Sequence, residues 1–417
     1  MRDNKMSFWK NTVSLYLMNI VKLVFPLLTL PYLTRTLSTD AYGVVTYVRA
    51  LVVYAQLVID FGFLLSATKK IVFVAESKEK VGRITGDTLA EKGILAICAM
   101  LFFVIAVFLI PVLNQNRIFS LLYLLSVLVT IFMFDFMFRG LEKMHLVAIP
   151  YIAAKSITTF LTLMMIHGDG ELLLIPALEV MGNVVAVIIS FYFVRKLEVR
   201  ISFSSFHQWL KDLKESFVYF ISNFATTVFG ALTTVIAGFY LSMSNIAFWG
   251  ICMQILSAAK AMYNPITNSL YPHMLREKDI KVIKKINVIM IIPMVIGSTI
   301  VIFASKTVMQ IIGGDKYIAA GNVLRVLLPA FIFSFYSMLY GWPVLGVIGK
   351  IKETMTTTII AAVVQVCGLV ILILSNRFSL YGLAISCSFS EIMLFFTRYF
   401  VYYKNKGLFK LDFGGVE

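Results

Sequence analysis

Ionisable residues inside long apolar blocks are the first candidates for chemistry in this sequence. Lys22, Lys155 and Lys260 each stand within such a block. An ionisable side chain at the centre of a bilayer costs about 2.5–3.5 kcal/mol on insertion scales, so it usually faces a bundle interior or a water-filled cavity. A lysine ammonium is a compact point charge that suits a phosphate group or an acidic sugar. We therefore expect these lysines, with Asn264 one helical turn after Lys260, to bind an anionic substrate.

Acidic residues inside similar apolar blocks are candidates for binding a coupling ion. Arg49 and Asp60 are eleven residues apart, close to three helical turns, and would share one side of a helix. Carboxylates in a partly desolvated cavity can bind and release protons, as ion-coupled transporters require. We expect Arg49 to join the substrate-binding residues, and the coupling ion to bind at Asp60, Glu179 and Glu391. The alternative for each of these charges is an internal ion pair that fixes helix packing.

Motifs for catalysis are absent from the sequence. The histidines have no HExxH or paired-ligand spacing, and no GxxxxGK[ST] loop is present to hold the phosphates of ATP. The cysteines also lack the spacing of metal ligands. We therefore expect no catalytic residue, no metal and no cofactor, and the chain cannot itself be the motor of an ATP-driven pump.

The elements that must position these residues are membrane-spanning helices. Hydrophobic residues make up 59% of the 417 residues, charged residues make up only 14%, and the mean hydropathy is +0.87. The apolar residues come in blocks of about 20, the length that an α-helix needs to cross a bilayer. We predict an all-α polytopic membrane protein with about twelve spans, near residues 13–34, 44–68, 93–113, 120–138, 147–166, 172–194, 217–241, 246–271, 287–305, 322–346, 355–375 and 381–402.

The distribution of basic residues predicts the orientation. Most of the 37 Lys and Arg residues fall at the amino terminus, in the loops after even-numbered helices and in the tail. Because cytoplasmic loops carry the excess of basic residues, both termini are predicted to be cytoplasmic. The net charge of +15 is dispersed over short loops, so the topology explains it and nucleic acid is not an expected partner.

A weak internal repeat predicts two lobes. Shifting the sequence by 204 positions aligns Asn19 with Asn223 and Asp60 with Asn264. We predict a six-helix lobe over residues 1–200, an interfacial linker over 201–216 and a second six-helix lobe over 217–417. Because six is even, both repeats have the same orientation, and such transporters bind near the midplane between the halves and alternate access by rocking.

An ordered set of short motifs resembles a known family. The chain resembles bacterial polysaccharide repeat-unit flippases, the O-antigen and capsule exporters of the multidrug/oligosaccharidyl-lipid/polysaccharide superfamily. The motifs, in the order of that family, are FPLLTLPYLTRTL at residues 25–37, AYGVV at 41–45, DFG at 60–62, FRGLEKM at 138–144, GDKY at 314–317 and VLRVL at 323–327.

The resemblance implies a MATE-like fold and a transport function. It implies that the chain moves an undecaprenyl-diphosphate-linked oligosaccharide from the inner to the outer leaflet of the bacterial cytoplasmic membrane. Because the sequence has no nucleotide-binding motif, we expect an ion gradient to drive this transport. The partners it implies are this lipid-linked substrate, membrane lipids, and a polysaccharide polymerase with other assembly proteins. Lipid II flippases of the same superfamily usually carry two additional helices, which are not among the predicted spans.

Other functions remain open at this point. A MATE-like drug or metabolite exporter is the nearest alternative, although such exporters favour an acidic cavity and this sequence has at least as many lysines as acids inside its spans. A membrane-embedded polysaccharide polymerase or ligase generally needs a large outer loop, whereas the predicted outer loops are short. A scaffold that transports nothing should not need charges at the centre of the bilayer.

Overall fold

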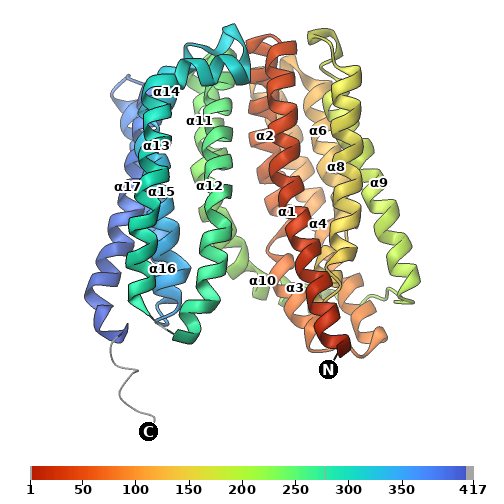
Figure 1. Cartoon of the computed structure of the whole chain (residues 1–417). Helices are drawn as coiled ribbons and strands as arrows, with labels where there is room; N and C mark the ends of the chain where they lie inside the picture. The colour runs from red at the N-terminus through yellow and green to blue at the C-terminus, as the bar shows by residue number, and fades with distance from the viewer. Residues whose placement is uncertain (1, 278, 410–417) are drawn as a thin grey trace. The chain divides into compact units, whose positions relative to one another are not determined.

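The computed structural model describes residues 2–277 and 279–409 (Figure 1), and the described residues contain helices and no strand. The chain divides into two compact units, Met1–Phe224 (unit 1) and Ala225–Glu417 (unit 2). Within the described residues, eleven helices are long and apolar enough to cross a membrane, or twelve if the bent pair Phe206–Thr227 and Gly230–Tyr240 is one span. The prediction of an all-α polytopic protein with about twelve spans is therefore confirmed. The orientation of the termini stays a prediction.

Unit 1 contains nine α-helices and the first part of a tenth. Within it, α8 packs against both α1 and α9, and α6 packs against α9 and α2 (Figure 1). The helices are α1 (Arg2–Thr36), α2 (Thr39–Asp60), α3 (Phe63–Val72), α4 (Lys78–Leu109), α5 (Pro111–Gln115), α6 (Arg117–Val129), α7 (Asp135–Gly140), α8 (His145–Met165), α9 (Leu174–Lys196) and α10 (Phe206–Thr227); the 3-10 turns η1 (Thr130–Phe132) and η2 (Asp169–Glu171) lie between them.

Unit 2 begins with the end of α10. In it, α15 and α16 both pack along α17. Its elements are the π-helical turn η3 (Val228–Leu232), α11 (Thr233–Tyr240), α12 (Met243–Glu277), α13 (Ile280–Gly313), the 3-10 turn η4 (Asp315–Tyr317), α14 (Ala320–Val326), α15 (Leu328–Tyr340), the π-helical turn η5 (Gly341–Gly346), α16 (Ile351–Leu374), α17 (Leu380–Asn405) and the 3-10 turn η6 (Lys406–Phe409).

Several helices begin earlier than their predicted spans, and for α4 (Lys78–Leu109) the difference matters for the site. The third span was expected to begin at residue 93, but α4 begins at Lys78, where the Ser77 hydroxyl accepts a hydrogen bond from the Lys80 backbone N–H. A serine that caps a helix in this way satisfies a backbone donor without an intrahelical partner. The extra turns carry Asp87, Glu91 and Lys92, which are all buried.

The long second span, Thr39–Val72, contains a local break between α2 and α3. Phe61 and Gly62 both have positive φ, 36° and 81°. A Cβ atom added at Gly62 would lie 2.5 Å from Cβ of Tyr219, a residue of α10 within unit 1. Glycine is needed here because it tolerates positive φ and leaves room for close helix packing.

The linker predicted at 201–216 covers the start of α10, which belongs to unit 1 and contacts α3 there. The Ser66 and Ser216 hydroxyls are hydrogen-bonded at 2.7 Å, and the Lys70 ammonium lies 2.7 Å from a carboxylate oxygen of Asp212. These contacts hold the first half of α10 on α3. The predicted lobe boundaries at residues 200 and 217 stay a prediction.

Candidate functional site

A polar cavity of about 480 Å³ lies inside unit 1. Most of its polar lining comes from helices that are distant in sequence: Arg49, Gln56 and Asp60 of α2, Lys92 of α4, Tyr123 and Ser126 of α6, Thr130 of η1, Asp135 of α7, Tyr151 and Lys155 of α8, and Glu179 and Asn183 of α9. Four of the predicted site residues, Arg49, Asp60, Lys155 and Glu179, therefore line one cavity. Its volume falls in the range of small-ligand pockets, about 300–1,000 Å³.

The first ion pair in this cavity joins α2 to α9. Nη2 of Arg49 lies 2.6 Å from Oε1 of Glu179, and Nε of Arg49 donates a hydrogen bond of 2.9 Å to the Tyr123 hydroxyl. Nearby, the Asn183 amide donates to the Ser126 carbonyl at 2.8 Å, which ties α9 to α6. The guanidinium is held in one orientation because its fork has partners on two helices.

The second ion pair joins α2 to α4. Nζ of Lys92 lies 3.2 Å from Oδ1 of Asp60. The other oxygen, Oδ2, accepts a hydrogen bond of 2.7 Å from the Gln56 amide, whose Oε1 in turn accepts one of 3.2 Å from Thr130. Lys92 is 6% exposed, so its charge depends on Asp60 for compensation.

Lys155 and Asp135 line the same cavity without an ion pair within 4.0 Å among the described residues. Lys155 is partly buried on α8 and keeps its ammonium available. Asp135 lies at the start of α7, close enough to Lys92 and Arg139 for their charges to act on it. The cavity lining therefore contains two ion pairs, one cation (Lys155) that is available to a ligand and one acid (Asp135) that is also available.

Lys22 is not part of the cavity lining. It is exposed on α1, and its ammonium lies 5.2 Å from the centre of the Tyr151 ring. Because Tyr151 itself lines the cavity, this cation–π contact brings Lys22 next to a residue of the lining.

The remaining predicted site residues belong to unit 2. Lys260 of α12 forms an ion pair with Glu391 of α17 through a very short hydrogen bond, and Glu391 is 3% exposed. Asn264, one turn further along α12, is exposed. The structure thus pairs two of the predicted residues, and the shared central cavity expected for Lys22, Lys155 and Lys260 stays a prediction.

Arg398 of α17 was not predicted as a site residue. It is 9% exposed, and its guanidinium donates to the Ser337 carbonyl and to the Thr358 hydroxyl at 2.9 Å. The Gly341 N–H, where α15 gives way to η5, bonds to the Met338 carbonyl instead of the Ser337 carbonyl. Arg398 therefore satisfies a carbonyl that the end of α15 leaves free.

Lys92 and Asp135 were also not predicted. Lys92 follows residues that read as a charged loop, and Asp135 sits at the edge of the predicted fourth span. The signal that could have placed Lys92 inside a helix is Ser77, which resembles an N-cap fifteen residues earlier.

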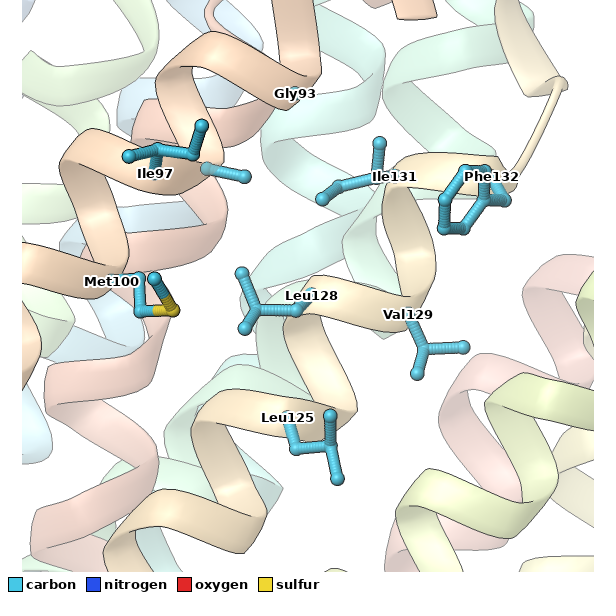
Figure 2. Close-up of a pocket in the computed structure, with 9 residues that line it drawn as sticks. Gly93, Ile97, Met100, Leu125, Leu128, Val129, Ile131 and Phe132 are labelled. Atoms are coloured by element: carbon cyan, nitrogen blue, oxygen red, sulfur yellow. The ribbon is translucent and has the colours of Figure 1, made fainter.

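A second cavity in unit 1, of about 310 Å³, has a different character. Figure 2 shows that its lining side chains come from one stretch of α4 and from α6 with η1. All of them are apolar: Gly93, Ala96, Ile97, Met100, Leu125, Leu128, Val129, Ile131 and Phe132. Such a surface offers no donor or cation to a charged group.

Comparison with known proteins identifies the family. The family model described as "Polysaccharide biosynthesis protein" matches residues 8–278. The chain belongs to this polysaccharide biosynthesis family. It is 25% identical over 410 residues to a putative O-antigen transporter of Escherichia coli (strain K12), covering 95% of this chain and 98% of that protein. It is 26% identical over 398 residues to a putative O-antigen transporter of Shigella dysenteriae, covering 92% and 97%.

The fold of this polysaccharide biosynthesis family member is MATE-like. An inward-facing multidrug resistance MATE family transporter superposes with a TM-score of 0.73 at 15% identity, covering 96% of this chain and 99% of the other. The lipid II flippase MurJ in an inward closed conformation gives 0.66 at 12% identity, covering 94% and 87%. With its spans and its bacterial relatives, the chain is a multi-pass protein of a bacterial cytoplasmic membrane.

Proposed function

We propose that this protein is a flippase that moves an undecaprenyl-diphosphate-linked oligosaccharide across the cytoplasmic membrane for polysaccharide synthesis, driven by an ion gradient. The relatives called putative O-antigen transporters and the lipid II flippase of similar fold support this substrate class. The observation that carries the proposal is the unit 1 cavity, whose lining includes Lys155, Arg49 and Lys92. A diphosphate group needs such cations, because moving its charge through hydrocarbon unaided is very costly.

The two ion pairs suggest how a substrate binds. Arg49 and Lys92 are neutralised by Glu179 and Asp60, whereas Lys155 is not, so Lys155 is the first contact that we propose for the diphosphate. An arriving phosphate then competes with the two carboxylates for their cations. Each carboxylate that loses its cation becomes a binding group for the coupling ion, which we propose for Asp60 and Glu179 and, in unit 2, for Glu391 with Lys260.

A complementation experiment tests the proposal. Lys155→Ala should abolish glycan export in a flippase-deficient strain while leaving the protein in the membrane, and Lys155→Arg should retain part of the activity. Lys22→Ala and Lys260→Ala should also abolish export. The control is Lys78→Ala, which removes an exposed lysine paired with Glu198. Full export by Lys155→Ala at normal abundance would contradict the proposed role.

A MATE-like drug or metabolite exporter is the second candidate. Its support is the similarity to the multidrug transporter and the composition of the unit 1 cavity, where three acids, Asp60, Asp135 and Glu179, match the three cations in number. Drug resistance that depends on this protein, with no effect on surface polysaccharide, would favour the second candidate.

A further inference from the structure

A second group of charges lies where α10 docks on α3 and α4. We call it the docking cluster: Lys70, Asp87, Glu91, Asp212 and Glu215. Oδ1 of Asp87 accepts hydrogen bonds from the Ser204 backbone N–H at 2.6 Å and from the Trp209 indole N–H at 2.8 Å. The Lys70 ammonium lies 2.7 Å from Asp212 and 3.1 Å from Glu215. The cluster therefore fixes the beginning of α10 to two other helices.

Glu91 differs from the other acids of the docking cluster. It is 1% exposed, and its Oε1 has no hydrogen-bond partner among the described residues. The charged groups that act on it are Asp212 of α10, Lys70 of α3 and Asp87 of α4. Lys70 is already shared by two carboxylates. The next residue, Lys92, is paired with Asp60 and lines the polar cavity.

An ionised carboxylate cannot be stable in this position. It would be desolvated without a donor or a cation of its own, and a buried group in that situation takes up a proton instead. It would also add a third negative charge to those of Asp87 and Asp212, with Lys70 as the one cation that acts on it.

We propose that Glu91 is a proton-binding site that holds a proton while α10 is docked on α3 and α4, and that loss of this proton releases α10. On release, the O–H bond of the carboxyl group breaks, the proton passes to a water molecule and the charge stays on Glu91. Asp212 lies on α10, so undocking this helix moves the Asp212 carboxylate away from Glu91, whereas Asp87 stays on α4 with Glu91. Because α10 continues along the chain into unit 2, the site offers proton-dependent control of the helix that links the units. This inference goes beyond the proposed function and does not depend on the substrate.

Infrared spectroscopy tests the protonation state without any transport assay. The full chain, purified in lipid nanodiscs at neutral pH, should show a C=O band of a protonated carboxyl group that decreases in Glu91→Gln. The matched control is Glu198→Gln, because the Lys78 ammonium lowers the pKa of the exposed Glu198 carboxyl and keeps it ionised. This control should retain the whole band. An unchanged band in Glu91→Gln would overturn the proposal.

Disulfide formation tests the release of α10. The Ser66 and Ser216 hydroxyls are 2.7 Å apart, so the double variant Ser66→Cys, Ser216→Cys should cross-link readily when α10 is docked. With Glu91 present, the rate should fall as pH rises, although thiolate formation alone would raise it. With Glu91→Gln added, which cannot ionise, the rate should rise with pH. The same pH profile in both backgrounds would overturn the proposed release.

Discussion

The two units use membrane-embedded charge in different ways. Under the predicted repeat of 204 residues, α2 of unit 1 would correspond to α12 of unit 2, and Gln56 to Lys260. In unit 1, α2 supplies an acid, Asp60, to a pair that lines an open cavity. In unit 2, α12 supplies a base, Lys260, to a pair whose acid, Glu391, is almost fully buried. The two helices therefore supply opposite charges to their ion pairs. We expect an ion pair that lines a cavity to be able to exchange one partner for a substrate or an ion, and a buried ion pair to stay closed.

Breaking the unit 2 pair should have the largest effect on stability. Glu391→Ala leaves the Lys260 ammonium without its partner, and because the Lys260 side chain is 33% exposed, we expect a cost below the value of about 3–5 kcal/mol for a fully buried pair. We expect a large loss of folded protein in a thermal unfolding assay. Replacing both residues, as Lys260→Met with Glu391→Leu, should recover much of this loss while abolishing export. A Glu391→Ala variant as stable as the wild type would show that the pair is not structural.

The break between α2 and α3 sharpens the comparison, because it has no counterpart in α12. The position that corresponds to Gly62 is Ile266, where the helix continues. Gly62→Ala should cost about 1–3 kcal/mol, since alanine is strained at positive φ and its Cβ would collide with Tyr219. The control is Gly93→Ala, where a Cβ meets nothing within 4 Å and alanine should stabilise the helix by up to about 1 kcal/mol. Equal melting temperatures for both variants would contradict this account.

Removing an exposed pair should have the smallest effect. The Lys78 ammonium and the Glu198 carboxylate are 2.7 Å apart but both are well exposed, so solvent screens their attraction. We expect no measurable change in the melting temperature of Glu198→Gln at neutral pH. The depressed pKa of Glu198 means that any contribution is present at neutral pH and is lost as the pH falls through that pKa. A clear loss of stability at neutral pH would show that the surface pair contributes more than expected.

The helical class and much of the unit 1 site could be predicted from the sequence. Apolar blocks of span length predict helices, and a charge inside such a block must face an interior, so Arg49, Asp60, Lys155 and Glu179 were found. Partners could not be predicted, because Arg49 and Glu179 are 130 residues apart in the chain. Lys92 was not predicted as a site residue, because a hydropathy profile locates the apolar part of a helix and not the polar turns that precede it.

The alternative, that the charges inside the spans form internal ion pairs, could also be stated from the sequence. The partners in those pairs could not be identified from it. The structure shows that Arg49, Asp60, Glu179, Lys260 and Glu391 are all paired, which is the arrangement that this alternative describes. Pairing and transport are compatible where the pair lines a cavity, since a substrate can replace one partner there. Their roles in substrate and ion binding stay predictions.

Our main proposal is that Lys155, the lysine of the unit 1 cavity without an ion-pair partner among the described residues, binds the diphosphate of the glycan as it crosses the membrane. The most direct measurement is flipping of an undecaprenyl-diphosphate-linked oligosaccharide by the purified protein in liposomes, comparing wild type, Lys155→Ala, Lys155→Arg and the surface control Lys78→Ala. The account predicts that Lys155→Ala is inactive, that Lys155→Arg is partly active and that Lys78→Ala matches the wild type. Equal flipping rates for Lys155→Ala and the wild type, at equal amounts of folded protein, would contradict it.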